Sequence, residues 1–274
     1  MKNSKMALIY DFDKTLSPKD MQEFHFIPSL GYDNPQDFWN ESRKNSELNN
    51  MDSNLSYMEL MVKKKPGLTR EDLINEGKYI KLYKGVDTWF KRINEYGLKH
   101  HVEVEHYIIS SGIREMIMGT SIAKEFKRVF ACSYAFDENG LALWPSRVVN
   151  YTTKTQYLYR VNKGIFDETN DYDLNKKTPI NEKHIPFRNM IYFGDGLTDV
   201  PSMRVVLDEG GYTVAVYGNK KAKEDLADQL KEDNRATFVV EADYSKDSMA
   251  EKLVKTLIDL ADTNAKLDEL KENG

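Results

Sequence analysis

Residues 6–15, MALIYDFDKT, indicate the fold most directly. The first half, Met6–Tyr10, is a short apolar run that ends abruptly in a carboxylate, which is typical of a buried strand. Residues two apart on an extended chain point to the same side, so Asp11 and Asp13 can both face one pocket at the carboxyl edge of a sheet.

This pair of aspartates favours phosphoryl chemistry. One carboxylate can attack phosphorus while the other donates a proton to the leaving oxygen. Two acids this close repel each other unless they share a cation, which indicates Mg²⁺. An ordinary acidic turn that caps the strand is the structural alternative.

A second acidic segment, GDGLTD at residues 194–199, directly follows the apolar run Met190–Phe193. A glycine on each side of Asp195 allows a tight turn that brings its carboxylate close to a ligand. Asp199 falls one helical turn further on, where it could bind a metal ion directly, act through water, or orient other ligands. A plain acidic loop is the alternative.

Two weaker signals lie between these segments. Ser110, Ser111 and Gly112 follow the apolar end of a predicted strand, where the Ser110 hydroxyl and the main-chain amides after it can donate hydrogen bonds to phosphoryl oxygens. Lys154 stands near the start of a predicted helix over residues 152–161, where a cation is unfavourable for the helix. That cost is explained if Lys154 faces a phosphate and a carboxylate, although a solvated surface lysine is more common.

The order of elements predicts an α/β class with a doubly wound, mainly parallel sheet, because buried strands alternate with amphipathic helices. The helix that opens at Gly85 is expected to stop at Gly97. Residues 134–144 carry a hairpin signal, DENG, at 137–140. The predicted strands lie at residues 6–10, 102–109, 129–132, 190–193, 212–216 and 237–240.

Residues 17–83 differ in composition from the rest of the chain. They are rich in aromatic and polar residues, follow a helical pattern and contain no convincing strand. Ser53 is expected to cap one helix, and Thr69 with Asp72 to begin another through a capping box. We therefore predict a discontinuous core of residues 1–16 and 84–274, with an inserted helical module at 17–83. The last helix, from about residue 248, either packs on its own domain, which we favour, or forms a homodimer contact.

Composition narrows the classes of function. The chain has 274 residues and a net charge of −5, which argues against a nucleic-acid-binding surface. Its single cysteine, Cys132, lies in an apolar run and is expected to be a buried thiol. No segment approaches the ~20 apolar residues of a membrane span, so we expect a cytoplasmic protein without membrane contact.

Taken together and in this order, the four segments resemble the four motifs of the haloacid dehalogenase (HAD) superfamily. The resemblance implies that Asp11 is the nucleophile and a magnesium ligand. Asp13 would be the general acid and then the base, with its carbonyl on the metal. Ser110 and Lys154 would bind the transferring phosphoryl group, and Thr15 would brace the nucleophile loop.

The same resemblance assigns Asp195 to the metal and Asp199 to the metal or its waters. The helical insertion after the first motif is similar to the C1-type cap of the phosphoserine-phosphatase-like branch. In that branch a Glu near this point helps to recognise the substrate, and Asp20 is a partial match. The implied substrate is a small phosphorylated metabolite, phosphoserine-like in kind.

Other members of the superfamily are separable by residue. Dehalogenases lack an acid at the position of Asp13, and ion-pumping ATPases carry Gly where this chain has Leu16. A phosphomutase, which uses the same two aspartates, stays open as the alternative function. A non-catalytic binding protein on the same scaffold is the third reading.

Overall fold

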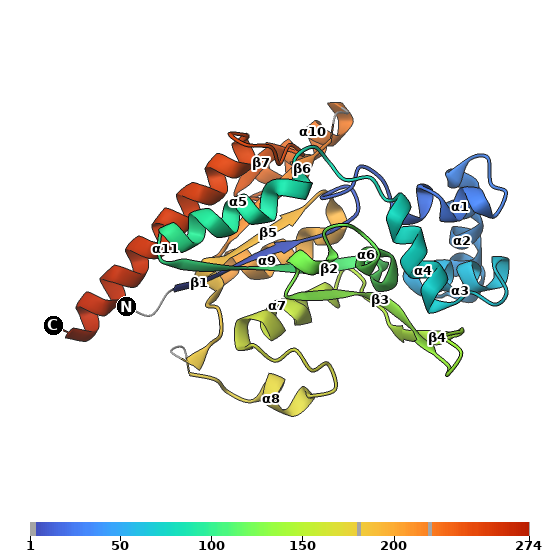
Figure 1. Cartoon of the computed structure of the whole chain (residues 1–274), viewed down its shortest axis with the longest axis horizontal. Helices are drawn as coiled ribbons and strands as arrows, with labels where there is room; N and C mark the ends of the chain where they lie inside the picture. The colour runs from blue at the N-terminus through green and yellow to red at the C-terminus, as the bar shows by residue number, and fades with distance from the viewer. Residues whose placement is uncertain (1–3, 180–181, 219–220, 274) are drawn as a thin grey trace.

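The computed structural model describes residues 4–179, 182–218 and 221–273. Within them the chain forms a seven-stranded sheet in the order β4-β3-β2-β1-β5-β6-β7, in which β4 alone runs antiparallel to its neighbour (Figure 1). The strands are β1 (Ser4–Tyr10), β2 (Val102–Ile113), β3 (Arg128–Phe136), β4 (Ala142–Arg147), β5 (Met190–Gly194), β6 (Tyr212–Tyr217) and β7 (Phe238–Glu241). The predicted α/β class and doubly wound sheet are confirmed.

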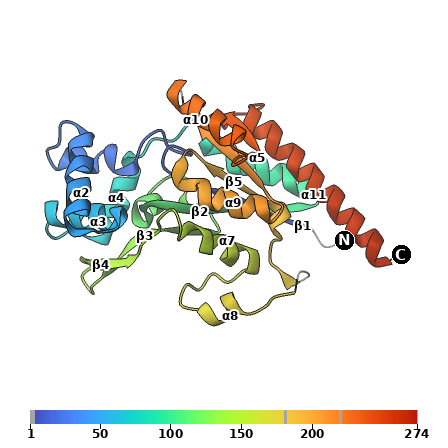
Figure 2. The ribbon, with the colours of Figure 1, turned by 180° about the vertical axis from the view of Figure 1, so that it is seen from behind.

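Helices cover both faces of the sheet. Figures 1 and 2 show α5 (Val86–Lys99) and α11 (Met249–Asn273) on one face and α7 (Lys154–Lys163) and α9 (Val200–Asp208) on the other. The remaining helices of this part are α6 (Arg114–Met118), α8 (Asp171–Asn175) and α10 (Lys221–Glu232). Single 3-10 turns occur at η1 (Met21–Glu23), η2 (Gly77–Tyr79), η3 (Ala123–Glu125), η5 (Phe187–Asn189) and η6 (Leu197–Asp199).

The strand order reverses at β1, which makes the carboxyl end of this strand the point where a doubly wound sheet opens a crevice. The chain runs from β1 outward to β2 and β3, and later returns to place β5 on the other side of β1. Tyr10 is level with Ile108 of β2 and with Phe193 of β5. The segments that follow these three residues therefore emerge side by side.

Four helices precede α5 and lie at this end of the sheet (Figure 1). They are α1 (Phe26–Ser29), α2 (Pro35–Asn49), α3 (Ser53–Lys64) and α4 (Arg70–Glu76). The predicted capping box of Thr69 and Asp72 is confirmed. The prediction that Ser53 caps α3 is wrong, because the Asp52 side chain accepts from the amides of Asn54 and Leu55 instead.

Two further expectations are corrected. The predicted strands on either side of Ser133 form one strand, β3, which turns at Gly140 (φ +79°) into β4. The helix α5 does not stop at Gly97 but continues to Lys99. Gly97 is needed for packing, since a Cβ there would lie 2.7 Å from the carbonyl oxygen of Val102.

The last helix, α11, buries the apolar stripe of its first half against α5 and β1. Val254 and Ile258 are fully buried, whereas Leu267 and Leu270 further along are 50% and 70% exposed. The expected packing on its own domain is therefore confirmed for this first half. Cys132 is buried, as predicted. Among the described residues, no helix is long and apolar enough to cross a membrane.

Candidate active site

The loop after β1 is a compact turn that presents two aspartates. The main-chain amide of Asp11 donates to the carbonyl of Phe193 on β5 at 2.9 Å, and the amide of Leu16 returns to the carbonyl of Phe12 at 2.9 Å. Lys14 takes the left-handed conformation (φ +60°), and its ammonium group donates to both carboxylate oxygens of Asp20, at 2.7 and 2.6 Å. Asp20 is therefore held in an ion pair at the rim of the site.

A fully buried lysine lies beneath this loop. Lys154 begins α7, and its Nζ lies 3.0 Å from Oδ2 of Asp11 and 2.7 Å from Oδ1 of Asp199. The hydroxyl of Tyr192, on β5, donates to the same Oδ1 at 2.8 Å. Burial opposes a charge on Lys154, but the adjacent carboxylates of Asp11 and Asp199 raise its pKa well above the ordinary value. The charged form of Lys154 is therefore favoured.

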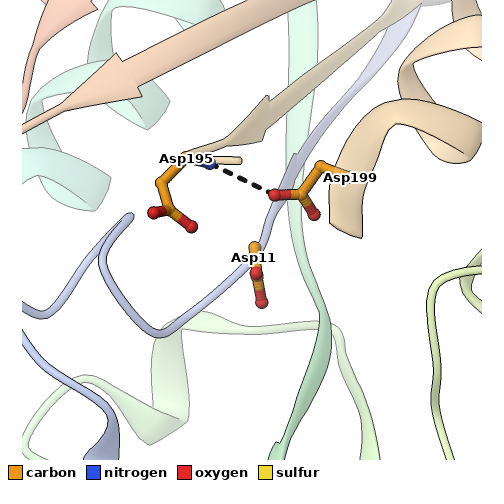
Figure 3. Close-up of side chains that lie close together, drawn as sticks. All are labelled: Asp11, Asp195 and Asp199. Carbon is orange, nitrogen blue, oxygen red and sulfur yellow. Dashed lines mark hydrogen bonds between the residues drawn. The ribbon is translucent and has the colours of Figure 1, made fainter. Parts of the chain in front are cut away.

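Asp199 also shapes the loop after β5. Its Oδ2 accepts from the main-chain amide of Asp195 at 3.2 Å (Figure 3). A Cβ on Gly194 would lie 2.5 Å from the Asp199 carboxyl carbon, so only glycine permits this approach. The carboxylates of Asp11, Asp195 and Asp199 each offer an oxygen within 4.8 Å of the others (Figure 3).

The end of β2 completes the floor of the site. The Ser110 hydroxyl, 1% exposed, accepts from the amide of Gly112 at 3.1 Å. Since that bond uses a lone pair of the hydroxyl oxygen, the O–H proton can be directed elsewhere. Asp13 approaches from the opposite loop, and its Oδ1 accepts from the Met21 amide at 2.9 Å.

These side chains surround a cavity of about 210 Å³. Most of the predicted site residues line it: Asp11, Asp13, Asp20, Ser110, Ser111 and Asp195. It continues into a second cavity of about 350 Å³, because Asp13, Asp20 and Ser111 belong to the walls of both. The second cavity extends to Trp39 and Arg43 of α2.

Excess carboxylate dominates the electrostatics. Burial raises the pKa of Asp11 to about 6 against the opposing effect of Lys154, and Asp199 and Asp195 add to the rise. Burial raises the pKa of Asp13 well above the ordinary value, with the charges of Asp20 and Asp11 adding to the effect. Since these carboxylates outnumber Lys154, a phosphate dianion would be repelled from such a site unless a further cation were present.

Because the excess negative charge of this site needs a counter-ion, its carboxylates fit a hard divalent cation. Asp11 and Asp195 supply oxygen donors at the cavity wall, which is the donor set that Mg²⁺ prefers. Asp199 is fully buried, and Lys154, Tyr192 and the Asp195 amide already bind its oxygens. Its contacts are those of a residue that orients its neighbours.

Several predicted site residues lie just outside the 210 Å³ cavity. Some residues that line this cavity were not predicted. Gly112 lines the larger cavity, and Lys154 lies beneath the smaller one. Thr15 is fully buried, its carbonyl accepts from the hydroxyl of Tyr244, and its Oγ1 has no hydrogen-bond partner among the described residues. Asn54 and Asn150 line the cavity without any sequence signal, because lone asparagines in polar segments are common.

No protein-family model matches the sequence. An uncharacterized protein of Borreliella burgdorferi (strain ATCC 35210 / DSM 4680 / CIP 102532 / B31) is 29% identical to it over 277 residues, which span 88% of this chain and 92% of that protein.

Solved structures share the architecture at low sequence identity. A substrate-bound phosphoserine phosphatase has a TM-score of 0.56 and 16% identity, over 91% of this chain and 97% of that chain. A probable phosphoserine phosphatase from Vibrio cholerae has a TM-score of 0.58 and 13% identity, over 96% and 67%. A HAD family hydrolase from Salmonella enterica serovar Typhi has a TM-score of 0.54 and 18% identity, over 81% of this chain and 66% of that one. The chain thus has the fold of the HAD-family hydrolases, in the form that phosphoserine phosphatases have.

Proposed function

We propose that this chain is a magnesium-dependent phosphomonoester hydrolase that transfers a phosphoryl group to Asp11 and then to water. The observation that supports this most is the buried Asp11–Lys154–Asp199 arrangement directly beneath a cavity lined by Asp13, Ser110 and Asp195. A nucleophile, an acid, a phosphoryl-binding hydroxyl and a metal ligand thus meet at one sheet edge, in the order that the sequence resemblance implies.

In the first step a carboxylate oxygen of Asp11 attacks phosphorus, and the bond from phosphorus to the leaving oxygen breaks. Asp13 gives its proton to that oxygen. The raised pKa of Asp13 favours the protonated form, which a general acid requires. The amide of Met21 fixes one Asp13 oxygen and thereby aims the carboxyl group.

In the second step the ionised Asp13 takes a proton from water as the water oxygen attacks the aspartyl-phosphate. The bond between phosphorus and Asp11 breaks, which restores the Asp11 carboxylate and releases phosphate. The Ser110 O–H, free to donate because Gly112 binds its lone pair, would hold an equatorial phosphoryl oxygen through both steps.

Magnesium would be held by Asp11, Asp195 and the main-chain carbonyl of Asp13, and when bound it would offset the charge on the phosphoryl oxygens. Asp199 would be a positioning residue, because its oxygens hold Lys154 and the Asp195 amide. Lys154 would in turn supply a fixed positive charge next to Asp11.

The remainder of the substrate would occupy the 350 Å³ cavity, and residues 17–83 would act as a cap over it. The hydroxyl of Tyr57 on α3 donates to the carbonyl of Ser111 at 2.6 Å, and the side-chain amide of Asn54 donates to the carbonyl of Val149 at 3.0 Å. These bonds tie α3 to the core next to the phosphoryl site. Asp20 and Arg43 would contact a small, polar leaving group, phosphoserine-like in kind.

The test is phosphate release from a panel of phosphorylated metabolites, with and without Mg²⁺, for the parent chain and for Asp11→Asn. The proposal expects turnover that needs Mg²⁺ and disappears in the variant, and the preferred substrate would identify the leaving group. If folded, magnesium-loaded protein releases no phosphate but moves phosphate between positions of a sugar phosphate, the chain is a phosphomutase.

A further inference from the structure

Met21 lies between two segments of the candidate active site. It opens the 3-10 turn η1, shortly after the loop that carries Asp13, and its side chain is fully buried. Its main-chain amide donates to Oδ1 of Asp13 at 2.9 Å. Its side chain reaches the end of β2, where it contacts Gly112 and Ile113. One residue therefore contacts both the acidic loop and the segment that follows Ser110.

The end of β2 is irregular at this contact. The register of β2 against β3 shifts between Ser110 and Ile113. A shift of this kind is a β-bulge, which bends a strand and changes the direction of nearby side chains. Pairing resumes at Ile113, whose amide donates to the sulfur of Met21 at 3.1 Å. A thioether sulfur is a weak acceptor, but here it binds the chain directly after the bulge.

Gly112 lies inside the bulge and leaves room for the end of the Met21 side chain. A Cβ on Gly112 would lie 2.0 Å from Cε of Met21 and 2.9 Å from its Sδ. The same Cβ would lie 3.0 Å from Oδ2 of Asp13. The methyl group of Met21 and the carboxyl group of Asp13 therefore both pack against Gly112.

The carboxyl group of Asp13 depends on these contacts for its orientation. If Met21 moved, Oδ1 of Asp13 would lose the amide that binds it, and the carboxyl group could rotate. General acid catalysis requires that the proton donor lies within hydrogen-bond reach of the leaving oxygen. A displacement of Met21 should therefore impair protonation of the leaving oxygen more than it impairs phosphate binding.

We propose that the side chain of Met21 is a positioning residue, whose thioether joins the Asp13 loop to the bulge of β2. It thereby fixes the general acid relative to the phosphoryl group that Ser110 binds. Met21 lines neither of the two active-site cavities, so it acts through Asp13 and not on the substrate. This inference rests on the proposed hydrolase function, in which Asp13 gives its proton to the leaving oxygen.

The test compares the parent with Met21→Leu on two aryl esters of nearly equal size. Leucine has a similar volume but neither a sulfur acceptor nor a Cε. The phenol that leaves from phenyl phosphate has a pKa of about 10, like a tyrosine side chain, and needs a proton. The leaving group of p-nitrophenyl phosphate does not. The value of kcat/KM reports the step in which this group leaves.

Met21→Leu is expected to lower kcat/KM at least ~10-fold for phenyl phosphate and less than ~3-fold for p-nitrophenyl phosphate. The matched control is Met6→Leu, since Met6 is also buried but lies in the amino half of β1. This control should keep the parent's ratio between the two esters. A purely structural role of Met21 would lower both values equally.

Gly112→Ala disturbs the same contact from the other side. Its new methyl group would displace Cε of Met21 and crowd Oδ2 of Asp13, so phenyl phosphate should again lose more than p-nitrophenyl phosphate. In the double variant with Met21→Leu the losses should be less than additive, because leucine has no Cε to displace.

Hydrogen exchange of the Ile113 amide, followed by NMR, tests the contact without turnover. Exchange should be faster in Met21→Leu than in Met6→Leu, and equal exchange would overturn the proposal. Equal losses for both esters, or additive losses in the double variant, would also overturn it and leave the hydrolase function intact. A parent chain that releases phosphate from no ester would instead refute the hydrolase function, and the positioning role with it.

Discussion

Both ends of the central sheet contain a buried carboxylate beside a lysine, yet the two carboxylates titrate in opposite directions. At the carboxyl end, burial and neighbouring carboxylates raise the pKa of Asp11 to about 6 although Lys154 opposes them. At the amino end, burial would raise the pKa of Glu105, but hydrogen bonds from Tyr107, His184 and Lys5 lower it to about 2.

The difference lies in the balance of donors and acceptors. Glu105 accepts from Tyr107, from His184 at 2.7 Å, from Lys5 at 3.1 Å and from Lys127 at 3.3 Å. Asp11 shares one buried lysine with Asp199 and has a further carboxylate, Asp195, close by. The charge of Glu105 is thus balanced by the donors around it, whereas the carboxyl end has an excess of carboxylates that a metal cation would balance.

Lys154→Met should have the largest effect, because it removes the only cation that the structure shows within ion-pair distance of both Asp11 and Asp199. Two buried carboxylates would lose their partner, which costs about 3–5 kcal/mol of unfolding free energy. The rate of phosphate release should fall by at least ~10²-fold. Urea unfolding and initial rates measure both, with the exposed Lys91→Met as the control.

Gly194→Ala should be next, since the new methyl group would lie 2.5 Å from the Asp199 carboxyl carbon. Displacement of Asp199 should destabilise the fold by about 1–3 kcal/mol and disturb Lys154 and Asp195 together. Gly196→Ala is the matched control, because no atom lies within 4 Å of its added Cβ. Equal unfolding free energies for the two variants would refute the close approach of Asp199 to β5.

Much of this site could be predicted from the sequence, and the reason is topological. Asp11 and Asp195 each follow an apolar strand, Ser110 lies near the carboxyl end of β2, and the carboxyl ends of parallel strands meet at one edge. Tyr192 was not predictable, because an apolar strand pattern indicates burial and not the partner of a hydroxyl. The Lys14–Asp20 ion pair depends on a left-handed residue in the turn, which no periodicity reveals.

Some boundaries escaped the sequence for a related reason. Gly97 has the appearance of a helix stop, but its role is set by the carbonyl of Val102, a contact that only the packed structure shows. The boundaries of the inserted segment at residues 17–83 stay a prediction.

Tyr192→Phe should have a smaller effect that is confined to the acidic end. It removes one of the hydrogen bonds to Asp199, so kcat should fall by ~10-fold with KM nearly unchanged, and stability by about 1 kcal/mol. Tyr212→Phe on β6 is the control, since the described residues give its hydroxyl no hydrogen bond. A change in KM alone would contradict a positioning role for Tyr192.

Glu105→Gln should leave phosphate release unchanged and alter only the dependence of stability on pH. The folded pKa of Glu105, about 2, lies below the unfolded value of ~4.3, so its contribution is complete above the unfolded value. That contribution disappears as the pH falls from ~4.3 towards the folded value. Urea unfolding of parent and variant should therefore differ more at pH 6 than at pH 3, and a pH-independent difference would contradict the lowered pKa.

The most direct test of the central claim is to trap the phosphoryl group on the protein. Asp13→Asn should retain attack on p-nitrophenyl phosphate, whose leaving group needs no proton, but should not activate water for the second step. After incubation with Mg²⁺ and an acid quench, peptide mass spectrometry should find one phosphoryl group on Asp11. A peptide phosphorylated elsewhere, or turnover by this variant with Asp11 unmodified throughout, would contradict the account.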